Sequence, residues 1–178
     1  MKELIAVIIT LGLVALIVTQ QAPKDTSQAL PKLPTFAVQD VDSIAVYAKD
    51  KTRLQAKRDG DKWIVEGADK PVYVQSNVVN QLLQDLQTMQ VKRVASRTED
   101  NFSRFSVLTD HVVLKNKQGE VLLDVFVGKP ATDLASTYIR LADENMVVTV
   151  DKVLTWQVKR THDAWLEQKA ATKDTSTE

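Results

Sequence analysis

The spacing of hydrophobic positions changes several times along the chain, and the first pattern is a continuous one. Residues 4–18 carry no charge, and only Thr10 and Gly12 interrupt their apolar character. A helix that is apolar on all sides needs an apolar environment, and residues 19–22 add the length to span a bilayer. We therefore predict a transmembrane helix within residues 1–22, with these membrane-spanning side chains: Leu4, Ile5, Val7, Ile8, Ile9, Leu11, Leu13, Val14, Leu16, Ile17 and Val18.

A cleaved signal peptide has the same layout as an uncleaved signal anchor, so the cleavage site decides between them. A cut after Ala22 would place Gln20 three residues before the bond and Pro23 directly after it, and both are unfavourable. An uncleaved signal anchor is therefore favoured. Lys2 and the terminal amine predict a cytoplasmic N-terminus, which makes the chain a single-pass protein of a bacterial inner membrane with a periplasmic domain.

Prolines then mark a spacer between the membrane segment and the folded part. Residues 23–35 contain Pro23, Pro31 and Pro34 among polar side chains, and this composition predicts a stiff linker. An extracytoplasmic domain is expected over residues 36–169, and a disordered tail over residues 170–178, where apolar periodicity is absent.

The first part of this domain alternates between strand and helix patterns. Residues 43–48 alternate apolar and small or polar positions, and residues 59–61 read Asp-Gly-Asp, a hairpin turn before a strand at residues 62–65. Residues 76–89 then have helical spacing, and Ser76 or Asn77 can cap that helix. The chain is expected to return to strand at residues 91–95.

A similar series follows. Strands are predicted at residues 111–114, 121–127, 137–141 and 146–150, and Asp151 can cap a final helix. These patterns predict an α+β fold, a mainly antiparallel sheet with helices on one face. The similarity of the two series also supports the hypothesis of a duplicated β-β-β-α unit.

Composition narrows the function classes. The chain holds 23 basic and 23 acidic side chains, so no excess of positive charge indicates nucleic-acid binding. The absence of cysteine removes disulfides and thiolate chemistry, and five glycines form no phosphate-binding loop. We therefore expect no nucleotide, no nucleic acid and no cofactor.

Candidate catalytic and metal-ligating residues do not form a recognisable motif. His111 and His162 have no second ligand at metal-binding spacing, and we interpret them as surface or interface residues. The acidic pair Asp59/Asp61 lies in a predicted turn, where acidic residues favour turn geometry. Neither a nucleophile elbow nor a carboxylate pair across a cleft is indicated, so we expect no enzyme, and a hydrolase is the least favoured alternative.

Two of the three tryptophans bear on the prediction of core and surface. Trp63 alternates with polar neighbours in a strand and is expected in the core. Trp156 lies at the edge of the apolar stripe of the last helix, and exposed tryptophans often anchor partner proteins. Trp156, Lys159 and Arg160 are therefore candidate partner contacts.

Several segments together resemble one bacterial family: RDGDKWIVEG, the helix SNVVNQLLQDLQTM running into VKRVAS, FSRFSV, and VGKP followed by STYIRL and VVTV. The chain is similar, over residues 42–169, to the domain-of-unknown-function family 4340. The resemblance implies a membrane-anchored exported domain, which in some members is encoded beside ABC-type transport components. Family members often carry a Tyr-Gly-Leu turn where this chain has Phe105-Ser106-Val107, so that loop is expected to differ.

The tether, the spacer and the absence of catalytic motifs predict a non-catalytic accessory or structural subunit. Its partners would be the bilayer, through the N-terminal helix, and a membrane or envelope protein complex. The alternative is a periplasmic lipid- or glycan-binding module that serves a transporter.

Overall fold

The fold is that of a computed structural model, which describes residues 30–49 and 51–167. The predicted transmembrane helix, the first part of the linker and the predicted tail lie outside these residues. Within the described residues, no helix is both long and apolar enough to cross a membrane.

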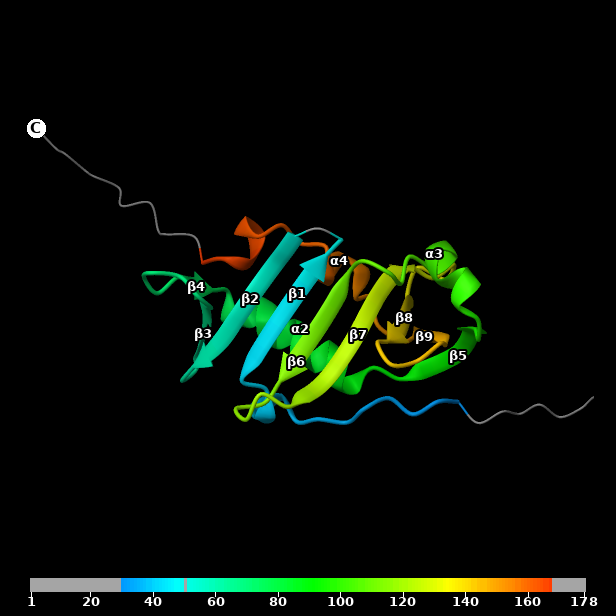
Figure 1. The fold of residues 1–178 in the computed structure, drawn as a ribbon, viewed down its shortest axis with the longest axis horizontal. Coiled ribbons are helices and arrows are strands. Elements are labelled where there is room, and N and C mark those ends of the chain that lie inside the picture. The colour runs from blue at the N-terminus through cyan, green and yellow to red at the C-terminus, as the bar shows by residue number, and fades with distance from the viewer. Residues whose placement is uncertain (1–29, 50, 168–178) are drawn as a thin grey trace, which may run out of the picture.

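One antiparallel sheet forms the framework of the domain (Figure 1). Its strand order is β4-β3-β2-β1-β6-β7-β8-β9-β5, and all neighbouring strands for which a register is given run antiparallel. The predicted α+β class with a mainly antiparallel sheet is thus confirmed. The strands are β1 Ser43–Ala48, β2 Lys51–Asp59, β3 Lys62–Val65, β4 Tyr73–Val74, β5 Val91–Ser96, β6 His111–Lys115, β7 Val121–Pro130, β8 Thr137–Leu141 and β9 Val147–Val150.

The strand order runs outward in both directions from the central pair β1 and β6. β1–β4 fill one half of the sheet and are followed by helix α2 (Ser76–Thr88); β6–β9 fill the other half and are followed by helix α4 (Thr155–Val158). The segment after each helix then crosses to the other half. β5 pairs with β9, and Leu166 forms a bridge with Val74 of β4. The two halves are therefore joined at both outer edges, while duplication of one unit stays a prediction.

α2 covers one face of the sheet and closes the main core. Its helical spacing buries Val79, Leu82, Leu83 and Leu86 against strand residues of alternating position, which include fully buried Trp63 as predicted. The predicted cap at its start is wrong: Gln75 occupies the N-cap position and its side chain makes no capping hydrogen bond to the helix, and the buried Ser76 hydroxyl has no partner among the described residues.

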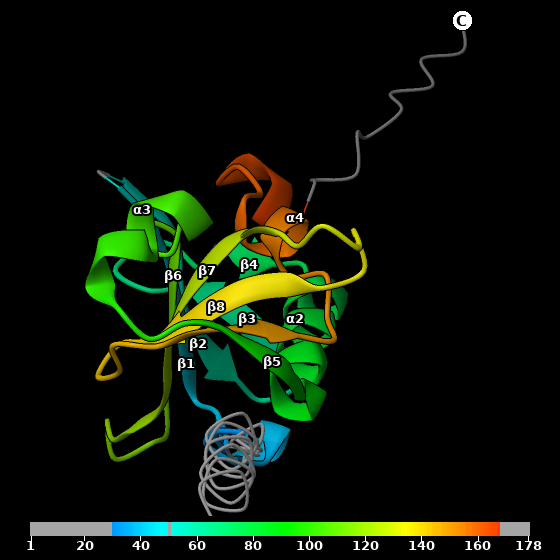
Figure 2. The ribbon, with the colours of Figure 1, turned by 90° about the vertical axis from the view of Figure 1, so that its right-hand side faces the viewer.

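A second, smaller core lies on the opposite face, under the short helix α3 (Phe102–Phe105) (Figure 2). Gly128 of β7 allows the backbone of Phe105 to approach, because a Cβ at Gly128 would lie 2.2 Å from the Phe105 carbonyl oxygen. Ser106 ends α3 with φ of 60°, the left-handed conformation that glycine adopts without strain. The sequence pattern predicted helices on one face of the sheet, whereas α2 and α3 lie on opposite faces.

α4 is only one turn long, and it is not capped as predicted. Leu154 occupies its N-cap position, whereas the Asp151 carboxylate accepts a hydrogen bond from the Gln90 N–H at 2.7 Å, at the exit of α2. The Thr155 hydroxyl of α4 donates to the Gly128 carbonyl at 2.8 Å and attaches the helix to β7. Short 3₁₀ turns occur at η1 (Val38–Asp40), η2 (Glu99–Asn101) and η3 (Asp163–Trp165).

Candidate functional site

The candidate partner contacts lie together on α4 and the residues directly after it. Thr155 and Val158 are buried, which turns the side chain of Trp156 away from the core and leaves it 70% exposed. Lys159 and Arg160 follow directly in the chain and are exposed. The prediction that Trp156 lies off the core is confirmed, whereas its role as a partner contact stays a prediction.

An ion pair attaches this segment to the sheet. The Arg53 guanidinium of β2 contacts the Asp110 carboxylate at 3.1 Å and donates to the Val158 carbonyl at 3.3 Å. The Lys159 ammonium lies 3.8 Å from the other Asp110 oxygen. Asp110 is 7% exposed, so its charge is largely removed from water and depends on these two cations. The position of the segment after α4 is thereby fixed relative to β2.

The same segment borders an open hollow of about 410 Å³. His162 contributes a fixed ring, because its Nδ1–H donates to the Arg53 carbonyl at 3.0 Å. This contact directs the other ring nitrogen, Nε2, away from the backbone. The hollow is lined by Ala48, Lys51, Thr52, Arg53, Lys159, Arg160, Thr161 and His162, so half of its lining residues are lysine or arginine.

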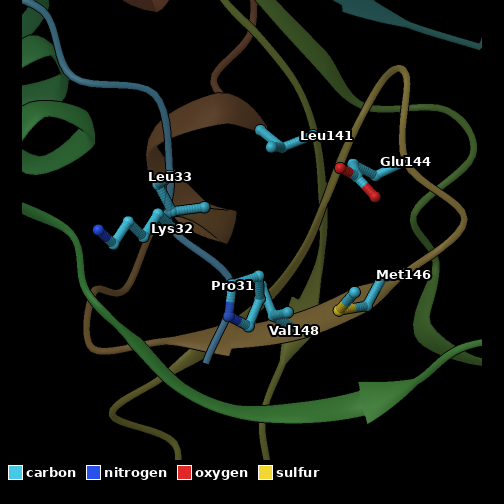
Figure 3. Close-up of a pocket in the computed structure, with 7 residues that line it drawn as sticks. All are labelled: Pro31, Lys32, Leu33, Leu141, Glu144, Met146 and Val148. Atoms are coloured by element: carbon cyan, nitrogen blue, oxygen red, sulfur yellow. The ribbon is translucent and has the colours of Figure 1, made fainter. Parts of the chain in front are cut away.

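The described chain begins on the side of the domain opposite α4. In Figures 1 and 2, which share a vertical axis, the segment from Leu30 to η1 lies at the bottom and α4 at the top. Figure 3 shows Pro31 and Leu33 beside Leu141, Met146 and Val148, residues of the β8–β9 hairpin region. The hollow between them measures about 30 Å³, which is room for about one water molecule. We interpret this contact as packing of the incoming chain.

The half of the sheet face that α3 leaves uncovered holds a second hollow, of about 380 Å³. There the His111 Nε2 contacts the Asp124 carboxylate, and the His111 ring stacks on Phe126 with centroids 4.3 Å apart. Sequence reasoning missed this pair. The residues lie on neighbouring strands β6 and β7, but only the register, which the sequence does not reveal, brings them together.

Arg140 and Asp133 have perturbed pKa values, and in both cases the cause is structural. Burial lowers the pKa of the Arg140 guanidinium, which lies over the Phe126 ring at 4.1 Å and donates to backbone carbonyls. Hydrogen bonds from Lys92, and secondarily from Ser136, lower the pKa of Asp133 to about 2. Both contacts hold loops in place.

Metal-binding chemistry has no visible support in the described part of the chain. Within residues 30–49 and 51–167, no group of three or more histidine and acidic residues is close enough to hold a metal ion. Asp59 and Asp61 flank the β2–β3 turn, in agreement with their interpretation as turn residues. The predicted membrane-spanning residues lie outside the described part.

A comparison with known protein families identifies the family of the chain. A family model described as "Domain of unknown function (DUF4340)" matches residues 63–177, which include α3, Gly128, α4 and four of the eight residues that line the hollow beside α4. The resemblance found in the sequence is thus confirmed. Neither a curated protein nor a solved structure matches the chain.

Proposed function

Since the chain belongs to the DUF4340 family, whose description assigns no activity, we propose its function from its own surface. We propose that it is a non-catalytic, membrane-anchored accessory subunit. Its periplasmic domain docks onto a membrane or envelope protein complex through the α4 surface, defined as Trp156, Lys159 and Arg160. The N-terminal helix supplies the contact with the bilayer.

The observation that carries this proposal is the exposure of Trp156. Its side chain is 70% exposed, whereas Trp63 and Trp165 are fully buried. An exposed tryptophan ring contributes none of its hydrophobic free energy to the folded domain, so the stability of the domain does not explain its presence. Tryptophan is enriched among the residues that dominate the affinity of protein interfaces. The flanking Lys159 and Arg160 supply the polar rim that such interfaces have.

The position of the α4 surface favours a protein partner over the chain's own membrane. The described chain begins on the side of the domain opposite α4 (Figures 1 and 2). A domain anchored through its N-terminus would then present α4 away from the point where the linker arrives. Trp156 would in that orientation meet another protein.

The test is affinity purification of the full chain from its native membrane in mild detergent, with mass spectrometry of the recovered complex. Trp156→Ala should reduce recovery of the partner more than tenfold, because interface tryptophans contribute about 2 kcal/mol or more. The stability of the domain should stay within about 0.5 kcal/mol. Val121→Ala is the matched control, because Val121 is also an exposed apolar residue, 55% exposed, but lies outside the α4 surface, at the start of β7.

Recovery of the same stoichiometric partner with Trp156→Ala as with the unchanged chain would contradict docking through α4. Recovery of a lone chain, with and without the substitution, would contradict the accessory-subunit proposal as a whole.

One observation favours the alternative of a ligand-binding module. The sheet-face hollow combines Tyr47 and His111 with hydrogen-bonding side chains such as Gln55 and Asp124, a mixture that suits a glycan better than a lipid chain. Bound glycan in mass spectra of the native protein, lost in Tyr47→Ala, would support this alternative over the docking proposal.

A further inference from the structure

We propose that the basic hollow beside α4 receives acidic side chains from the docking partner. The basic hollow is defined by Lys51, Arg53, Lys159, Arg160 and His162. This inference rests on the proposed docking function and adds the chemistry of the partner: a protein segment that carries Asp or Glu carboxylates next to the apolar group that covers Trp156.

Charge concentration is the first argument. The chain as a whole has a formal net charge of zero. Four of the eight residues that line the hollow are nevertheless lysine or arginine, and none of the eight is acidic. Asp110, which contacts Arg53 and Lys159, offsets one of these charges. Among the residues that the structure describes, the hollow therefore keeps an excess of positive charge, which attracts carboxylates and repels basic partners.

The tertiary structure assembles this charge from two distant segments. Lys51 begins β2, whereas Lys159, Arg160 and His162 follow α4. Arg53 holds the two segments together through Asp110 and the Val158 carbonyl. Because Arg53 is already committed to these contacts, Lys51 and Arg160 are the cations best able to bind an incoming carboxylate. In the described part of the chain, neither forms a salt bridge.

The apolar and basic parts are adjacent in the chain, which limits the partner further. Trp156 lies in the single turn of α4 and Arg160 follows four residues later, just after the helix ends, so one partner segment can cover the ring and reach the cations. Charges at the rim of an interface act mainly on the rate of association and on specificity, whereas the buried aromatic ring supplies most of the affinity. Removing the basic charges should thus weaken docking less than Trp156→Ala does.

Zero-length carbodiimide cross-linking tests this inference directly. The reagent joins a lysine amine to a carboxylate only when the two groups are in salt-bridge contact. Applied to native membranes that contain the full chain, it should join Lys51 or Lys159 to Asp or Glu residues of another protein, as identified by mass spectrometry of the linked peptides. A link from Lys159 to Asp110 of the same chain is the internal control.

Charge reversal provides the second measurement. The double variant Lys51→Glu with Arg160→Glu should lower partner recovery about tenfold at low salt, and less at high salt, because rim charges are screened. The matched control is Lys117→Glu, which reverses an exposed charge in the β6–β7 turn. Thermal unfolding of each variant shows that the domain remains folded.

The outcomes separate the two proposals. If Trp156→Ala releases the partner, but charge reversal does not and no intermolecular lysine link forms, the acidic-partner inference is overturned and the docking function stands. If the unchanged chain recovers no partner, the docking function itself fails. If charge reversal releases an anionic phospholipid while the protein partner remains bound, the hollow binds a lipid headgroup and the inference is overturned.

Discussion

The helices α2 and α4 each follow a series of four strands, β1–β4 and β6–β9, yet they differ in which side chains they bury and expose. α2 has 13 residues and buries four apolar side chains, while its outer side carries polar groups such as Gln81 and Asp85. α4 has four residues, buries Val158, and exposes Trp156. The two helices meet where Gln157 donates to the Asp85 carboxylate at 2.7 Å.

This difference separates structural residues from candidate functional ones. The outer side of α2 is what solvation alone would select, because polar side chains on an exposed face have no cost in water. The outer side of α4 carries an apolar ring that neither solvation nor the core explains. Four comparisons between variants test how far the two halves of the domain differ in what stabilises them.

The largest expected effect is in α2. Leu83→Ala removes a fully buried side chain and should lower the free energy of unfolding by about 3.5 kcal/mol. Val158→Ala in α4 removes fewer carbons and should cost about 2 kcal/mol. Urea unfolding, followed by the fluorescence of the buried tryptophans, measures both values. Equal losses of unfolding free energy in the two variants would show that α2 and α4 contribute equally to the stability of the domain.

The second effect concerns the close contact between Gly128 of β7 and α3, on the face of the sheet opposite α2. Gly128→Ala places a Cβ 2.2 Å from the Phe105 carbonyl oxygen, so α3 or β7 must shift, at a cost of about 2 kcal/mol. Gly119→Ala is a useful comparison, because its Cβ meets nothing within 4 Å and the cost arises from its φ of +82° alone. Amide hydrogen exchange should show lost protection in β7 and β8 for Gly128→Ala only.

A smaller effect, of opposite sign, is expected in the neighbouring turn. Ser106 has φ of 60°, which strains a residue with a Cβ, so Ser106→Gly should relieve that strain. Part of the gain is lost to the greater freedom of glycine in the unfolded chain, and a net stabilisation of about 0.5 kcal/mol is expected. Ser106→Ala keeps the Cβ and should give no gain in the melting temperature.

The smallest effect is the pH dependence of the Lys92–Asp133 salt bridge, which joins β5 to the β7–β8 loop. Lys92 contacts Asp133 at 2.9 Å and lowers the pKa of this carboxyl from 3.8 to about 2. The stabilisation is therefore fully present above about pH 5 and is lost as the pH falls from there through 2. The difference in melting temperature between the unchanged chain and Asp133→Asn should narrow over this interval. A constant difference would show that the charge of Asp133 contributes nothing.

Local patterns in the sequence were sufficient for most of the elements. Alternation predicted β1, the Asp-Gly-Asp sequence predicted the β2–β3 turn, and helical spacing predicted α2 with its buried face. The caps were wrong, because capping depends on where the chain enters a helix. Asp151 illustrates this: its carboxylate binds the Gln90 N–H, a residue 61 positions away.

The sequence by itself determined the α+β class and the family, because each depends on short-range periodicity or on ordered motifs. It placed Trp156 only at the edge of an apolar stripe, and the structure shows that the side chain is exposed. Only the tertiary structure decided that β5 pairs with β9 in the other half of the sheet. It also decided that α3 lies on the second face and that His111 contacts Asp124. It also brought Lys51 to the segment after α4. Such contacts join residues far apart in the chain, and strand register, which no local pattern encodes, determines which of them meet.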